Sequence, residues 1–173
     1  MPEVLVGLVG GGVNEMSEAF SCICKNGKKY RVINMETEPE AAEKVDLLLA
    51  AEASPLLAEL IPRIPDGGYL VVNADEPRIF PYLAQCSAKC ITYGFNPRSC
   101  ITVSSIGEEN LQICLQRFFV SMDGSTCEPS EYPSPINDGS DPAVALGAAA
   151  ACAAHGLGIQ SSMSTKTAGP RIV

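Results

Sequence analysis

The stretch Tyr69-Leu-Val-Val-Asn-Ala-Asp-Glu-Pro77 runs from four apolar residues into a polar turn and a proline. A short, continuous apolar segment of this kind is typical of a parallel strand that is buried on both faces. Asp66-Gly67-Gly68 turns the chain into this strand, and the residues after it predict a helix over Pro77–Cys86 and a strand over Lys89–Phe95. The stretch therefore predicts a strand–helix–strand unit.

The same alternation of strands and helices extends toward the N-terminus. Val4–Val9 is an apolar run of strand length that ends in Gly10-Gly11-Gly12, and a helix is predicted from Val13 to a C-cap at Asn26-Gly27. The segments that follow predict a strand, a short acidic helix or turn, a buried strand and a helix, in the order Tyr30–Met35, Glu38–Val45, Asp46–Ala51 and Pro55–Ile64. This alternation predicts a three-layer α/β fold with a mostly parallel, doubly wound sheet of the P-loop or Rossmann-like type.

The pattern changes after Asn96. Cys100–Ile106 and Leu111–Leu115 alternate apolar and polar residues, and Met122-Asp123-Gly124-Ser125 is a hairpin turn signal. These segments predict a small antiparallel hairpin extension of the sheet. Pro129–Asp141 is rich in Pro, Ser and Asp, so we expect a loop there.

An alanine-rich helix is predicted to close the domain. Asp141 suits its N-cap, Pro142 suits its first turn, and the helix is expected to run to His155. Almost without side-chain bulk, such a helix must pack closely against its neighbours. We expect a single domain over residues 1–160 and a polar C-terminal tail over residues 161–173.

The composition excludes several classes of partner. The net charge is −8, and an acidic surface repels nucleic-acid backbones and anionic membranes, so neither is expected to bind. The apolar run Val4–Val9 has the length of a strand rather than of a signal peptide or membrane span, so we expect a cytoplasmic protein. Eight cysteines without a CxxC pair, and one histidine, predict reduced thiols that serve as small apolar residues rather than a metal site.

Segments in the second half of the chain carry a resemblance to a known family. They are Tyr69–Pro77, Cys90-Ile-Thr-Tyr-Gly-Phe-Asn96, Ile101-Thr-Val-Ser-Ser-Ile106 and the alanine-rich run Ala145–Ile159. Together they resemble the middle, ATP-binding domain of the Mur ligases, enzymes that join amino acids to peptidoglycan precursors. In that family one strand ends in an Asn-Ala-Asp-Asp-Pro-like turn beside the nucleotide, a later strand ends in Tyr-Gly, and a hairpin and an alanine-rich helix complete the domain.

The resemblance implies candidate nucleotide-binding residues. Gly10, Gly11 and Gly12 fall at the family's phosphate loop, where backbone N–H groups meet a phosphate at a helix N-terminus, although glycines serve any tight turn. Asn73 and Asp75 fall where the family contacts the base and ribose, and the alternative is that they only shape a turn. Weak binding of ATP or ADP is thus left open, and no other cofactor is implied.

The departures from the family concern catalysis. Asn14 stands where the phosphate-binding lysine is expected, and Glu15 stands where a hydroxyl would hold magnesium. Glu52 falls at the acidic magnesium position but has lost that partner, so it is a weak candidate for a metal ligand and no metal is expected. The segment between Ser54 and Gly68 is too short for the family's second magnesium site and modified lysine, and the two substrate domains are absent.

These observations leave three functions open. The first is a non-catalytic Mur-ligase-like module, a pseudoenzyme that binds a Mur-ligase-type or other cell-wall protein, or a second copy of itself. The second is a regulatory domain that binds an adenine nucleotide. The third is one part of a split ATP-dependent amide ligase, active only in a complex. The acidic charge and the loss of the lysine favour the first.

Overall fold

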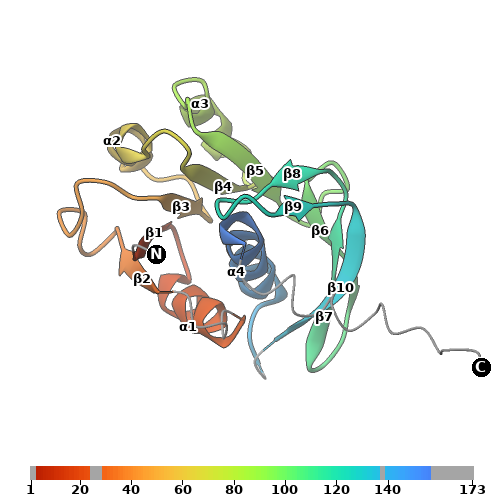
Figure 1. The fold of residues 1–173 in the computed structure, drawn as a ribbon. Coiled ribbons are helices and arrows are strands. Elements are labelled where there is room, and N and C mark those ends of the chain that lie inside the picture. Colours follow the sequence, from red (N-terminus) through yellow and green to blue (C-terminus); the bar gives the residue numbers. More distant parts are fainter. Residues whose placement is uncertain (1–2, 24–28, 137–138, 157–173) are drawn as a thin grey trace, which may run out of the picture.

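The computed structural model describes residues 3–23, 29–136 and 139–156 (Figure 1). An eight-stranded sheet has the order β10-β7-β6-β5-β4-β3-β1-β2, and a second, two-stranded sheet pairs β8 with β9. The strands are β1 Val4–Val9, β2 Tyr30–Asn34, β3 Leu47–Ala50, β4 Tyr69–Asn73, β5 Lys89–Tyr93, β6 Ile101–Ile106, β7 Asn110–Leu115, β8 Phe119–Val120, β9 Thr126–Cys127 and β10 Ser130–Pro135. The helices are α1 Val13–Ile23, α2 Leu57–Leu60, α3 Phe80–Leu83 and α4 Pro142–His155, with short 3-10 turns at Ile61–Arg63 and Pro77–Ile79.

Strands β1 to β6 pair in parallel, and β7 and β10 add to the β6 edge in antiparallel fashion. The strand order reverses at β1, which lies between β2 and β3. In a doubly wound sheet, ligands bind at the carboxyl ends of strands beside such a reversal. The α/β fold with a mostly parallel sheet is thus confirmed, and its topology marks the ends of β1 and β3 as the place for a site.

Helices cover both faces of the sheet, and each face has its own apolar core. Residues of α1 and α4 pack on one face, in a cluster that includes Phe20, Leu8 and Leu49. Residues of α2 and its following turn pack on the other face, in a cluster that includes Leu60 and Leu70. Figure 1 shows α1 and α4 on one side of the sheet and α2 and α3 on the other, which makes three layers.

Helix α4 is the most deeply buried helix of the fold. Every residue from Val144 to His155 is buried, and most of these side chains are a single methyl group. Asp141 caps the helix, since its Oδ1 accepts a hydrogen bond from the Ala143 N–H at 2.9 Å, and Gly156 ends it with φ of 88°. The predicted cap and extent of this helix are confirmed. Small side chains let the helix approach both α1 and the sheet closely.

The hairpin β8–β9 turns at Met122–Ser125 as predicted, and it is anchored to the core at two points. The Tyr69 hydroxyl of β4 donates to the Val120 carbonyl of β8. The Met122 N–H donates to the Ala154 carbonyl near the end of α4 at 2.8 Å. The hairpin therefore ties the C-terminal end of α4 to the middle of the sheet.

The prediction of a loop over Pro129–Asp141 is wrong in its first part. Ser130–Pro135 forms β10, an edge strand that pairs with β7 and buries Tyr132 and Ser134. Prolines are tolerated on an edge strand where the missing N–H would have faced solvent. The Ile136 N–H donates to the Glu109 carbonyl on the β7 side, so the N–H positions of Pro133 and Pro135, which alternate with it, face the free edge and fit that rule.

Several predicted helices are shorter in the structure. Pro55–Ile64 and Pro77–Cys86 each contain one α-helical turn of four residues beside a 3-10 turn, because prolines interrupt both segments. Of the two alternatives for Glu38–Val45, a short helix or a turn, the structure has turns. The predicted C-cap at Asn26-Gly27 and the tail over residues 161–173 lie outside the described residues.

The expectation that all eight cysteines are reduced thiols is wrong, because Cys152 is part of a disulfide. Cys152 on α4 is disulfide-bonded, whereas Cys86, Cys90, Cys100, Cys114 and Cys127 are free. Sequence spacing detects local cysteine pairs, but a disulfide joins residues that the fold brings together.

Within residues 3–23, 29–136 and 139–156, no helix is long and apolar enough to cross a membrane.

We expect the close packing of α4 to make it intolerant of larger side chains. Ala150 is fully buried, so Ala150→Leu should lower the free energy of unfolding by about 1–3 kcal/mol through overpacking. Ala58 is exposed on α2, and the matched Ala58→Leu change should leave stability nearly unchanged. Chemical denaturation of the three proteins measures the difference. Equal stabilities for all three would contradict the packing described for α4.

Candidate functional site

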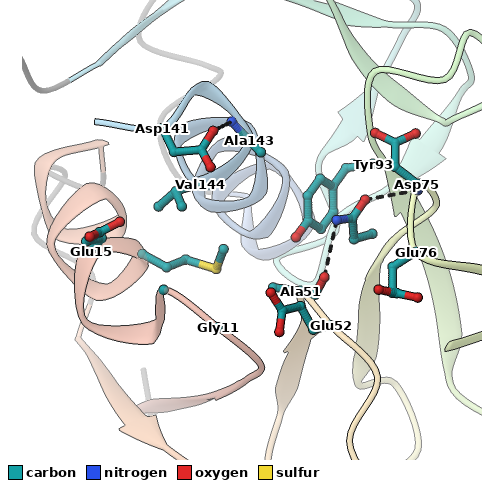
Figure 2. A pocket seen from close by; sticks show the side chains of 13 residues that line it. Gly11, Glu15, Ala51, Glu52, Asp75, Glu76, Tyr93, Asp141, Ala143 and Val144 are labelled. Carbon is teal, nitrogen blue, oxygen red and sulfur yellow. Dashed lines mark hydrogen bonds between the residues drawn. The ribbon is translucent and has the colours of Figure 1, made fainter. Parts of the chain in front are cut away.

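A cavity of about 450 Å³ opens at the carboxyl ends of the central strands, beside the strand reversal at β1 (Figure 2). Its lining comes from the glycine turn after β1, the first turn of α1, the segment after β3, the ends of β4 and β5, and the start of α4. Of the predicted nucleotide-binding residues, Gly11, Gly12, Asn73 and Asp75 line it, as does Glu52. Gly10 lines a neighbouring cavity of about 300 Å³ with Asn14 and Glu36.

The glycine turn is held against the segment that follows β3. Gly10 and Gly12 have positive φ of 112° and 71°, a conformation that glycine adopts without strain. A Cβ atom on Gly10 would lie 2.6 Å from the Glu52 backbone nitrogen, so a side chain is excluded there. A Cβ atom on Gly11 would lie 2.7 Å from Glu52 Oε1. The Glu52 carboxylate therefore lies directly over the turn.

A second carboxylate also meets this turn. The Gly10 N–H donates a hydrogen bond to Glu36 Oε1 at 3.2 Å. Helix α1 begins at Val13, the first helical hydrogen bond runs from the Met16 N–H to the Gly12 carbonyl, and Glu15 lies in the first turn. The turn thus keeps the strand-to-helix geometry of an anion-binding loop, but the chain's own acidic side chains surround it.

The charged side chains that line the cavity are negative. Among the described residues, its lining includes five carboxylates and no lysine or arginine; the carboxylates are those of Glu15, Glu52, Asp75, Glu76 and Asp141. Arg78 lies near its rim but pairs with Glu76, with Nε–Oε1 and Nη2–Oε2 distances of 2.7 Å. This pair lowers the pKa of Glu76 to about 2 and raises the pKa of Arg78. The more distant negative charge of Glu52 also raises the pKa of Arg78.

Asn73 and Asp75 make hydrogen bonds within the protein. Asn73 Nδ2 donates to the Ala51 carbonyl at 3.2 Å, and its Oδ1 accepts from the Asp75 N–H at 3.0 Å (Figure 2). The Asp75 carboxylate accepts from the N–H groups of Phe95 and Asn96 at 2.6 and 3.0 Å. These bonds join the ends of β3, β4 and β5, so both side chains organise the turns that form the cavity wall.

Tyr93 is a site residue that was not predicted from the sequence. It is the last residue of β5, its side chain is 2% exposed, and it lines the cavity. Its hydroxyl makes no hydrogen bond within the described residues. A Cβ atom on Gly147 of α4 would lie 2.9 Å from this hydroxyl oxygen, so the glycine leaves room for the ring. Burial raises the pKa of Tyr93, and the nearby charges of Asp75 and Glu52 add to the effect.

The carboxylates do not converge on one point. No group of three or more His, Cys, Asp or Glu side chains that could hold a metal ion occurs in the described part of the chain. Glu52, the weak metal candidate, lies against Gly11 instead. The geometry offers dispersed negative charge around a cavity rather than a coordination sphere.

Solved structures of Mur ligases share this fold. The crystal structure of MurF from Acinetobacter baumannii matches 91% of this chain and 44% of its own length, with a TM-score of 0.65 and 11% sequence identity. A structure of the UDP-N-acetylmuramoylalanyl-D-glutamyl-2,6-diaminopimelate–D-alanyl-D-alanyl ligase of the same organism matches 92% of this chain and 44% of its own, with a TM-score of 0.60 and 10% identity.

The comparisons at the level of sequence find nothing. No protein-family profile matches the chain, and no curated protein matches it. The chain spans less than half the length of the two ligases that it resembles in structure. At 10–11% identity the likeness concerns the fold: the chain has the α/β fold of a domain of the Mur ligases.

The ion pair at the rim predicts a pH dependence. The pKa of Glu76 is about 2 in the folded protein and 4.5 in the absence of its partner, so the pair stabilises the fold above pH 4.5. This stabilisation is lost as the pH falls from 4.5 toward 2. In Arg78→Ala, the pKa of Glu76 should rise toward 4.5, as followed by NMR of the side-chain carboxyl carbon. Arg98→Ala, at another exposed arginine, should leave it low, and a Glu76 pKa that does not respond to Arg78→Ala would contradict the pairing.

Proposed function

We propose that this chain is a non-catalytic Mur-ligase-like module that does not bind the triphosphate of ATP. The observation that carries the proposal is the Glu52 carboxylate, which lies over Gly11 where a phosphate would approach the N–H groups of the turn. Glu15 lies in the helical turn that follows, and Asn14 offers no positive charge. The turn keeps its shape without the charges that phosphate binding requires.

Coulomb's law gives the size of the repulsion that a phosphate would meet from these carboxylates. Two like charges about 4 Å apart repel by roughly 4 kcal/mol at the effective dielectric constant of a protein surface. Glu15 and Glu52 both line the cavity, and no lysine or arginine of the described part of the chain lines it to offset them. Helix α1 offers its N-terminal dipole, but that effect contributes only about 0.3–1 kcal/mol at an exposed site. Repulsion therefore outweighs the attraction that the turn retains.

A module of this kind would act through binding rather than catalysis. The likeness of its fold to MurF favours a cytoplasmic setting and a partner among the Mur-ligase-type or other cell-wall proteins, or a second copy of the chain. The net charge of −8 favours a partner with a basic surface over a nucleic acid or an anionic membrane.

The two alternatives have less support. An adenine-nucleotide-binding regulatory domain would use Asn73 and Asp75, but both side chains already form hydrogen bonds that organise the cavity wall. A split ATP-dependent amide ligase would need its missing phosphate-binding lysine from another chain. It would also need Glu52 to leave its position over Gly11.

A calorimetric titration with ATP and with pyrophosphate, each with and without magnesium, tests the proposal. The parent protein should show no measurable binding. The triple variant Asn14→Lys/Glu15→Thr/Glu52→Ala should bind pyrophosphate. Its dissociation constant should lie roughly ten- to a hundredfold below the highest value that the titration can detect, as expected for one charge-assisted contact and the removal of repulsion. Val13 needs no change, because it starts α1 and no non-glycine residue of the described chain has positive φ.

A matched control separates the site from overall charge. Gln85→Lys/Glu18→Thr/Glu59→Ala makes the same changes of charge at exposed positions outside the cavity, and it should bind no pyrophosphate. Tight binding of magnesium ATP by the parent would contradict the proposal. So would magnesium-dependent phosphate release by the parent that disappears in Glu52→Ala.

A further inference from the structure

We propose that the cavity binds an aliphatic diamine or polyamine, held by the carboxylates of Glu15 and Glu52 and by the hydroxyl of Tyr93. This inference rests on the proposed function, since a cavity that admitted a triphosphate would not keep these carboxylates free. It assigns to the same place in the fold a ligand of opposite charge.

Two of the five carboxylates remain available to a ligand. Asp75 accepts two backbone N–H groups, Glu76 pairs with Arg78, and Asp141 caps α4. Glu15 and Glu52 accept no hydrogen bond and form no ion pair within the described residues, and both are exposed to the cavity. Glu15 comes from the first turn of α1 and Glu52 from the segment after β3, so the cavity lies between two unpaired negative charges (Figure 2).

The Tyr93 hydroxyl is an independent sign of a polar ligand. The Tyr93 side chain is 98% buried, and its hydroxyl, which makes no hydrogen bond within the described residues, reaches the cavity that the residue lines. Figure 2 shows this hydroxyl directed into the cavity, on the same side as Ala51 and Glu52. Its oxygen can accept an N–H of an ammonium group.

The rest of the lining favours an alkyl amine over a bare cation. The carboxylates are dispersed, and no cluster able to hold a metal ion occurs among the residues that the structure describes. Between them lie apolar side chains, those of Met16, Ala51, Ala143 and Val144. A chain of methylene groups would contact this apolar wall while its terminal ammonium groups reach the carboxylates. A cavity of about 450 Å³ is large enough for such a molecule.

Calorimetric titration with putrescine and spermidine, at fixed ionic strength, tests the proposal. The parent should bind at least one of them, and 1,6-hexanediol, which has the methylene chain without the charges, should not bind. In Glu15→Gln/Glu52→Gln, the dissociation constant should rise roughly ten- to a hundredfold, as expected for the loss of charge-assisted contacts. Tyr93→Phe removes only the hydroxyl and should weaken binding roughly threefold or more, with an unchanged melting temperature in the absence of ligand as the check on folding.

The matched control is Glu18→Gln/Glu59→Gln, which removes the same two negative charges from exposed positions of α1 and α2 outside the cavity. It should bind the amine as the parent does. Equal losses in both double variants would overturn the proposal, because they would show attraction to the overall charge. Binding of oligolysine without binding of either free amine would overturn it as well.

Absence of binding to any amine, together with absence of binding to ATP, would contradict this inference but would be consistent with the proposed function. Binding of magnesium ATP would contradict the proposed function itself. The two failures are therefore distinguishable in one set of titrations.

Discussion

The close approach of the glycine turn after β1 to the segment after β3 is the constraint on which the site depends. The Gly10 position leaves no room for a Cβ atom, because the Glu52 backbone nitrogen would lie 2.6 Å from it. This contact places the Glu52 carboxylate over Gly11 and brings the start of α1 beside the end of β3. The parallel pairing of β1 with β3 fixes the register of the contact, from Val6 with Leu47 to Val9 with Ala50.

Helix α4 completes the site on the face of the sheet that α1 also covers. Its alanines allow it to lie against α1 and the strands, and its Gly147 leaves room for the Tyr93 ring at the end of β5. Asp141, which caps the helix, also lines the cavity. The same small side chains that pack the core therefore bring the Tyr93 hydroxyl into a cavity that five carboxylates of the described chain also line.

The fold could be predicted from the sequence because β1, β3 and β4 are continuous apolar runs and α4 has a clear N-cap at Asp141. β10 was missed because Pro133 and Pro135 argue against a strand unless the edge position is known. The sequence identified Glu15 only as a departure from the family's magnesium-binding hydroxyl, and Glu52 only as a weak candidate for a metal ligand. Their shared cavity with Tyr93 could not be predicted, because it depends on β1 lying between β2 and β3 and on Gly147, more than fifty residues beyond Tyr93.

The central claim is that the chain's own carboxylates have replaced phosphate recognition at this turn. NMR of the side-chain carboxyl carbons of Glu15 and Glu52 tests it most directly, with magnesium ATP and spermidine added in separate titrations. The account predicts that both resonances shift and saturate with spermidine and stay unchanged with magnesium ATP. Saturable shifts with magnesium ATP, and none with spermidine, would contradict it.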